Sequence, residues 1–431
     1  MANPHTSSLQ PLKTAAVLST VMLIAAGCAE DRGSGGSGGG GPSVDYGASK
    51  EEYAAALADM EPVTLTLQST APKGAATGRR FEEYAAAVEE WSDGKITFEI
   101  VFSNAIAPAN EVDDALADGR LDIGSVMPSL EPAEFPANNV MWDVSFVGRQ
   151  TPVDGLLQWH GAILETAAQE DALYEEFEAR GMKLLLPAFH SGAIAYSCTS
   201  ERADLDSLKG ATIASQSRVQ NGQVEALGMQ PSTVNYAEMF ESLERGVVDC
   251  ALGTFTVAAL NGYIPSAPYF VVDPEVGFGN AGGSIAISLA TWESLPLAAQ
   301  QLLYDRLDVL LQANYESTWD NIADSLTQVE ENDGAVLPLA KDAREALAAY
   351  NEQALAEAAN NSALPDSEAF VTALEQALEE WTAKVEQTAP GLDVGYDEFL
   401  EWHAAGYPDL QSYFDQLWSD AMQQRRPGSE A

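Results

Sequence analysis

The central part of the chain switches between two hydrophobic patterns, one with the period of a strand and one with the period of a helix. VTLTLQ at 63–68 alternates in polarity, and apolar residues recur at helical spacing over 81–91. A second alternating run follows at 95–102, and a short acidic helix at 109–118 leads into the apolar strand 121–126. This order predicts a mainly parallel sheet with helices on its faces.

A second group of strands and helices follows a less regular stretch. The predicted helices at 217–227 and 236–245 are each closed by a glycine. From Leu295 to residue 385 the chain is predicted to be helical, and the aromatic residues of 396–424 are expected to pack as core. The strands predicted in this part are 182–189, 193–200, 211–216, 247–255 and 284–290. We therefore expect an α/β fold with a helical C-terminal region.

Length and charge add two constraints. The chain has 431 residues, more than one compact core usually holds, so we expect two lobes. Its 65 acidic residues face 21 Lys and Arg, which gives a net charge of −44. Such a surface repels phosphate backbones and anionic lipid headgroups. We therefore expect no binding to nucleic acid and no electrostatic docking on a membrane, and we interpret the charge as a strongly hydrated surface.

The sequence shows no recognised pattern for a metal, a cofactor or catalysis. The acidic residues do not form a calcium loop, and the four His and three Cys lack the spacings of a zinc site. There is also no G-x-S-x-G motif, and no cysteine and histidine at the spacing of a catalytic dyad. We expect no metal, no cofactor and no enzymatic activity, so an extracytoplasmic enzyme is the weaker alternative.

The first residues resemble a bacterial lipoprotein signal. Residues 15–27 form an apolar run after Lys13, too short for the about 20 residues that span a bilayer. Small residues lead directly into Cys28, although Ala25 stands where such signals usually have Leu. The resemblance implies removal of residues 1–27 and attachment of a lipid to Cys28. An ordinary cleaved signal with an incidental Cys is the alternative.

The residues after Cys28 are suited to a tether. GSGGSGGGG at 33–41 is a flexible sequence that forms no core. We expect residues 28–60 to link a lipid anchor to the folded body. The protein would then lie outside the cytoplasm, on the outer face of the cytoplasmic membrane, held there by the lipid alone.

Five stretches in a fixed order resemble the solute-binding proteins of TRAP (tripartite ATP-independent periplasmic) transporters. The first begins at strand 63–68 and ends in W-S-D-G-K-I-T-F-E-I, and G-R-L-D-I-G follows in the second. L-K-G-A-T-I and E-A-L-G-M form the third stretch. The last two are Y-A-E-M-F-E-S-L-E-R-G-V-V-D at 236–249 and W-E-S-L-P-L-A-A-Q-Q-L-L at 292–303.

The resemblance implies a two-lobed clamshell that traps a ligand in the cleft between its lobes. Lobe I would comprise 61–191 and 280–318, and lobe II would comprise 192–279 and 319–431. Members of this family perform no chemistry and deliver their solute to the permease subunits of the transporter. We therefore expect a small solute and a membrane permease as partners, and a monomeric protein.

Three polar ligand positions of the family differ here. The arginine that usually grips a ligand carboxylate is replaced by Ala214, and a second polar position is held by Ala193 or Ile194. The residues from Cys250 replace a Gln-Glu-Asn run. Because a buried carboxylate without a cation is costly, we expect a solute other than a simple carboxylate. A ligand-sensing or scaffold lipoprotein with the same fold and no transport role is the alternative.

Other candidate ligand-binding residues lie on loops at strand ends, where open α/β sheets bind ligands. Arg218, near the start of the predicted helix 217–227, could replace the missing arginine, and the alternative is a solvent-facing side chain. Ordinary packing is the alternative for each of the others. These are Thr70, Lys73, Trp142, Phe189, His190, Gln216, Asn235, Tyr236 and Phe255.

Two cysteines remain in the body of the chain. Cys198 and Cys250 both fall in predicted strands of lobe II, and an extracytoplasmic compartment permits disulfides. A disulfide bond between them and a pair of buried thiols are both consistent with the sequence.

Overall fold

The computed structural model describes residues 42–234 and 238–429. The leader, Cys28 and the Gly/Ser-rich stretch lie outside these residues, as do Asn235 and Tyr236. Within the described ranges, no helix combines the length and the apolar composition that a membrane span requires.

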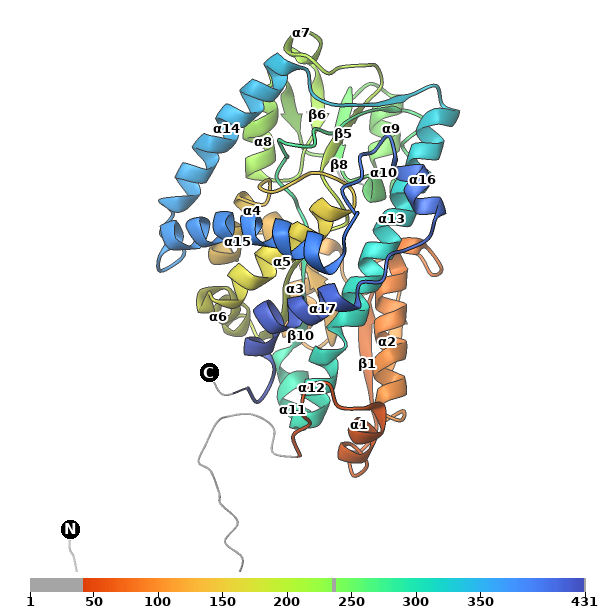
Figure 1. The fold of residues 1–431 in the computed structure, drawn as a ribbon, viewed down its shortest axis with the longest axis vertical. Coiled ribbons are helices and arrows are strands. Elements are labelled where there is room, and N and C mark those ends of the chain that lie inside the picture. Colours follow the sequence, from red (N-terminus) through yellow and green to blue (C-terminus); the bar gives the residue numbers. More distant parts are fainter. Residues whose placement is uncertain (1–41, 235–237, 430–431) are drawn as a thin grey trace, which may run out of the picture. The chain divides into compact units, whose positions relative to one another are not determined.

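Strands and helices alternate along the first two thirds of the chain, and helices dominate the last third (Figure 1). The strands are β1 (Val63–Gln68), β2 (Ile96–Val101), β3 (Ile123–Val126), β4 (Met182–Phe189), β5 (Ala195–Cys198), β6 (Thr212–Ala214), β7 (Gln230–Ser232), β8 (Cys250–Gly253), β9 (Tyr269–Val271), β10 (Gly283–Ser288) and β11 (Ala335–Leu337). The α-helices of the first half are α1 (Lys50–Ala56), α2 (Arg79–Trp91), α3 (Val112–Ala117), α4 (Pro136–Asp143), α5 (Asp154–Ala168), α6 (Asp171–Ala179), α7 (Leu205–Leu208) and α8 (Arg218–Ala226). Those of the second half are α9 (Met239–Glu244), α10 (Phe255–Asn261), α11 (Leu289–Ser294), α12 (Leu297–Asp305), α13 (Leu307–Glu331), α14 (Lys341–Ala359), α15 (Ser367–Thr388), α16 (Phe399–Ala404) and α17 (Gln411–Leu417).

The first sheet, which we call sheet A, has the strand order β2-β1-β3-β10-β4. β1 pairs in parallel with β2 and β3, as the strand–helix–strand pattern predicts. β10 is antiparallel to both of its neighbours, β3 and β4. This strand follows β5–β9 in the chain, so sheet A is completed by a segment that returns from the second sheet.

The second sheet, sheet B, has the order β11-β9-β5-β8-β6-β7. The predicted strand 247–255 is too long, because β8 stops at Gly253 and Thr254 caps the helix α10. The Thr254 side chain accepts a hydrogen bond from the amide of Val257 at 3.1 Å, which fixes the start of that helix. The three-residue strand β11, within the region predicted as continuous helix, pairs with β9.

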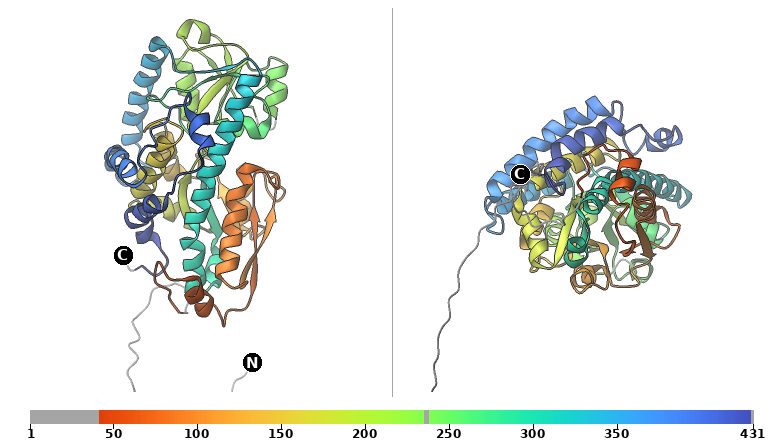
Figure 2. Two further views of the ribbon diagram at one scale, coloured as in Figure 1. Left: turned by 45° about the vertical axis from the view of Figure 1, so that its right-hand side comes forward. Right: turned by 90° about the horizontal axis from the view of Figure 1, so that it is seen from below.

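The helix α13 connects the regions of the two sheets (Figures 1 and 2). It packs on α2, which follows β1 of sheet A, and on α10, which follows β8 of sheet B. The strands of sheet A all fall within 61–191 and 280–318, and those of sheet B within 192–279 and 319–431. The C-terminal helices do not all lie beside the same sheet. α14 packs on α8, which contacts β7 of sheet B, whereas α15 packs on α5, which contacts β4 of sheet A.

One hydrophobic core includes residues of both sheets. Leu67 and Ile285 of sheet A belong to the same buried cluster as Ala214 and Ala251 of sheet B. A smaller cluster around Tyr196 lies on sheet B. Among the C-terminal aromatic residues, the most deeply buried are Phe399, Tyr413 and Trp418. The two sheets therefore share one continuous apolar core, to which the helices between them, such as α13, also contribute.

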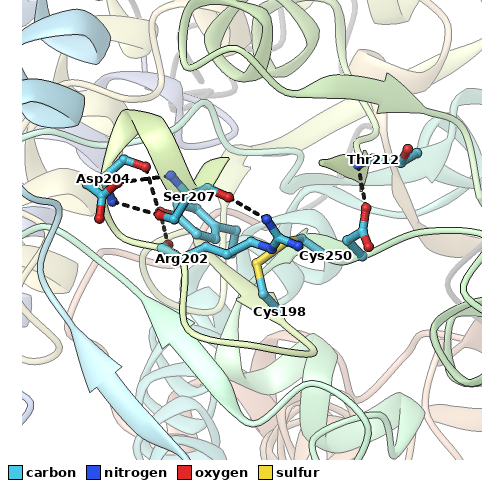
Figure 3. The surroundings of a disulfide bond; sticks show 8 residues. Cys198, Arg202, Asp204, Ser207, Thr212 and Cys250 are labelled. Atoms are coloured by element: carbon cyan, nitrogen blue, oxygen red, sulfur yellow. Dashed lines mark hydrogen bonds between the residues drawn. A yellow bond between two sulfur atoms is a disulfide. The ribbon is translucent and has the colours of Figure 1, made fainter. Parts of the chain in front are cut away.

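A disulfide bond crosses sheet B (Figure 3). Cys198 of β5 is directly opposite Cys250 of β8 in the antiparallel register, with the Cα atoms 4.1 Å apart. Both side chains are fully buried. The guanidinium of Arg202 lies beside the bond and donates a hydrogen bond to the carbonyl of Ser207.

Candidate functional site

Two segments that cross between the sheets meet at one place. The first joins β4 to β5 through His190, and the second joins β9 to β10 through Asn280. The Asn280 side chain donates a hydrogen bond to the Gly192 carbonyl at 3.3 Å, and its backbone amide donates to the Ser145 hydroxyl at 2.7 Å. Hydrogen bonds therefore join the crossing segments to each other and to the loop after α4.

A narrow hollow of about 10 Å³, room for about one water molecule, lies at this junction. It includes Ala193, which with Ile194 is one of the two candidates for the second polar ligand position of the family. Its other walls come from the loop after α4, from α5 and from both crossing segments. The residues that line it include Ser145, Gln150, Trp159, His190, Ala193 and Asn280.

His190 at the hollow is bonded to a second buried histidine, His160 of α5. Nδ1 of His160 donates to the Leu156 carbonyl at 2.8 Å, and its Nε2 accepts from the His190 amide at 3.3 Å. Nδ1 of His190 accepts from the Gly192 amide at 3.1 Å. These partners require both rings to be neutral, with the proton of His190 on Nε2.

Burial keeps both rings uncharged. It lowers the pKa of His160 to about 4, and burial together with the nearby His160 lowers the pKa of His190 well below its usual value. A neutral His190 offers a single N–H donor, suited to an uncharged or anionic acceptor on a solute.

Aromatic rings form one wall of the site. Trp159 meets His190 edge-on with ring centroids 4.2 Å apart, and Trp142 stacks at 6.0 Å on Trp159. Nε1 of Trp142 has no hydrogen-bond partner among the described residues, whereas Nε1 of Trp159 donates to the Ser145 carbonyl. A Cβ atom at Gly282 would lie 2.6 Å from Cη2 of Trp142, so the chain needs glycine there.

The sequence analysis did not identify Arg80, which lies next to this site. It occupies the first turn of α2, after β1, and only 6% of its surface is exposed. Nη1 donates to Oδ1 of Asn314 at 2.5 Å, and the Asn314 amide donates to the His190 carbonyl at 3.0 Å. The guanidinium carbon lies 5.0 Å from the centre of the Phe189 ring. An Arg-Arg pair at a helix start suggests a solvent-facing charge, and no local signal indicates burial.

Three of the predicted residues come together at the junction. His190 lines the hollow, Trp142 is stacked on its Trp159 wall, and Phe189 is the last residue of β4, beside Arg80. Ala214 lies fully buried in the shared core. These three residues therefore lie together at the junction, and their contact with a solute stays a prediction.

Other predicted residues do not lie at the hollow. Phe255 is stacked between Phe270 and Tyr396 in the core, because it begins a helix instead of ending a strand. Lys73 is exposed near the ring of Phe102, and Thr70 precedes it in the same loop.

Two further predicted residues form a hydrogen bond or an ion pair with other parts of the chain. The Gln216 side chain donates to the Val234 carbonyl at 2.8 Å. Arg218 forms an ion pair with Asp143, and its side chain is 68% exposed.

A family model and solved structures match this chain. The model "Bacterial extracellular solute-binding protein, family 7" matches residues 67–361. A TRAP periplasmic solute-binding protein from Bradyrhizobium sp. BTAi1, in complex with galacturonate, has a TM-score of 0.60 at 17% identity, covering 74% of this chain and 100% of that one. A marine metagenome TRAP protein specific for pyroglutamate has a TM-score of 0.62 at 16% identity, with the same coverage.

A Bordetella pertussis solute receptor that binds pyroglutamic acid is similar as well, with a TM-score of 0.61 at 15% identity over 74% of this chain and 99% of that one. No curated protein matches the sequence. The similar structures show that the chain has the two-lobed fold of these proteins.

Proposed function

The chain belongs to the bacterial extracellular solute-binding proteins of family 7, and we propose that it captures a small solute between its lobes and delivers it to a TRAP-type membrane permease. The family is a class of solute-binding transport proteins and not a class of enzymes. The observation that supports the proposal is the meeting of polar and aromatic side chains where the segments cross between the sheets, around a narrow hollow that would widen to admit a solute. A solute held there would contact both crossing segments and so favour one arrangement of the two lobes.

The proposed solute is not a simple carboxylate held in the usual way of the family. Ala214 is fully buried in an apolar core and offers no donor where the family has an arginine. The similar structures were solved with galacturonate and pyroglutamate, both acids. An acid bound here would have to be neutralised by a residue other than 214.

The place of action that we propose is the outer face of the cytoplasmic membrane. The family is extracytoplasmic. A lipid on Cys28 and the Gly/Ser-rich stretch after it would keep a monomeric body close to the permease. Mass spectrometry of the membrane-extracted protein should find the lipid on an N-terminal Cys28. An unmodified Cys28 would contradict this part of the proposal.

A thermal-shift screen of the full chain tests the capture of a solute. Uronic acids, pyroglutamate, aromatic acids, neutral sugars and amides would each be added at rising concentration. We expect one class to raise Tm with concentration, because a ligand at about 100 times its Kd adds about 2.7 kcal/mol to the free energy of unfolding.

Two outcomes of the screen would change the proposal. No shift with any class would favour the sensing or scaffold role, for which the apolar residues Ala193 and Ala214 are the supporting observation. Large shifts with small carboxylates alone would contradict the expectation drawn from Ala214.

A further inference from the structure

Arg80 is a buried cation without an anionic partner among the described residues. Its hydrogen bond goes to the neutral amide of Asn314, and its Nε atom has no partner in the described part of the chain. Burial alone lowers the pKa of Arg80 to about 10, with no carboxylate acting against it. The guanidinium is therefore charged at neutral pH, and its charge is not compensated.

The arrangement of these contacts leaves one edge of the guanidinium for a ligand. Nη1 is occupied by Asn314, whereas Nε is buried and has no partner among the described residues. Nε and Nη2 together form the pair of parallel donors that a carboxylate accepts. We propose that Arg80 binds the acidic group of the solute from the lobe I side, in place of the arginine that is missing at position 214. This inference rests on the proposed solute-binding function and names the residue and the ligand group.

The position of Arg80 fits this role. It follows β1 at the carboxyl edge of sheet A, where open α/β sheets bind ligands. Arg80 does not itself line the hollow, but Asn314, which accepts its hydrogen bond, donates to the carbonyl of His190, which does. The ring of Phe189, the residue before His190, packs against the guanidinium. Because Trp159 and His190 form one side of the hollow, an acid with a flat body would find a stacking surface there, beside the polar groups of the other side.

Other arginines near the site have carboxylate partners. Arg149 lines the hollow but is paired with Asp154 and Asp393. Arg218 is paired with Asp143 and is exposed. Arg79, next to Arg80 on α2, is paired with Asp320 at 3.0 Å. An anion at any of these would compete with a protein carboxylate, whereas an anion at Arg80 would not.

The test compares full-length wild type with Arg80→Met, which keeps the length of the side chain and removes its charge. Binding of phenylacetate, benzoate, pyroglutamate and galacturonate would be measured by thermal shift and calorimetry, each beside its uncharged amide. We expect at least one acid to bind wild type, and its affinity for Arg80→Met to fall about 100-fold or more. The Tm of the ligand-free variant should equal or exceed that of wild type, because an uncompensated charge has been removed.

Matched variants separate this role from a structural one. Arg79→Gln and Arg218→Gln should bind the same acid within about threefold of wild type, because both residues are exposed or paired. Arg80→Lys should fold and bind the acid with intermediate affinity, since it keeps the charge but loses the two-pronged edge. This second variant keeps the test decisive if Arg80→Met does not fold.

The results distinguish the failure of this inference from the failure of the proposed function. If wild type binds only uncharged solutes, or if Arg80→Met binds the acid as tightly as wild type, the inference is overturned and solute binding stands. Loss of acid binding in Arg149→Gln but not in Arg80→Met would also overturn it. If wild type binds no solute of either kind, both fail.

Discussion

At the scale of single residues, the junction of the sheets is held by groups that must stay uncharged. His160 and His190 form a chain of hydrogen bonds in which Nε2 of His160 and Nδ1 of His190 act as acceptors. Protonation of either nitrogen would remove an acceptor and place a charge among buried aromatic rings. The bonding of the crossing segments therefore depends on neutral imidazoles.

This dependence gives a prediction for pH. His160 titrates near pH 6.5 when unfolded and near about pH 4 when folded, so the unfolded chain binds more protons as the pH falls. The stability that neutral His160 contributes is complete above the unfolded pKa and is lost as the pH falls toward the folded pKa. Between about pH 7 and pH 5 this should lower the free energy of unfolding by about 2 kcal/mol.

Urea unfolding of wild type and His160→Gln at both pH values would measure the effect. The drop between the two pH values should be smaller in the variant by about this amount. His403→Gln is the control, because His403 lies against Asp320 on α13, away from the junction. An equal drop in wild type and His160→Gln would show that another group causes the pH dependence.

The residues of the site differ in how visible they are in the sequence. Phe189 and His190 end a clearly apolar strand, and Trp142 is a large aromatic residue in an irregular stretch, so position and chemistry suggested them. Arg80 carried no such signal, because its burial comes from α13 and Phe189, which are distant in the sequence. Local patterns can place a residue on a helix, but not against the distant helix that covers it.

At the scale of elements, the disulfide joins two neighbouring strands that are 52 residues apart in the sequence. It closes a loop that contains the strands β6 and β7 and the helices α7, α8 and α9. Closing a loop of this length removes conformational freedom from the unfolded chain, for which the chain-entropy relation gives about 4 kcal/mol.

The double variant Cys198→Ala/Cys250→Ala should therefore unfold with a free energy lower by up to about 4 kcal/mol. Wild type in the presence of a strong reductant should approach the same value. Chemical unfolding of the oxidised, reduced and variant proteins would measure both effects. Identical unfolding of all three would mean that the two cysteines are not bonded in the protein.

Element boundaries were predicted best where the local pattern decides them. The predicted strands 63–68 and 182–189 have the bounds observed for β1 and β4. β11 was not predicted, because three residues are too few for a pattern and the strand exists through its pairing with β9. The end of β8 was misjudged because Thr254 acts as a helix cap within an apolar run.

At the scale of the folded body, residues 42–429, two sheets are joined by crossing segments and share one core. Length and the order of motifs predicted two lobes. They did not predict that α15 packs on α5 while α14 packs on α8, since a helical pattern shows which face is apolar but not which distant surface covers it. The partner of an amphipathic helix is decided by the surfaces that remain uncovered when it docks.

A crystal structure of the full chain with the most strongly stabilising solute is the measurement that tests the central claim most directly. We predict density for the solute at the junction of the sheets, in contact with His190 and with the segment that joins β9 to β10. Density for the solute on an outer face of either sheet, with the junction filled only by side chains, would contradict the claim.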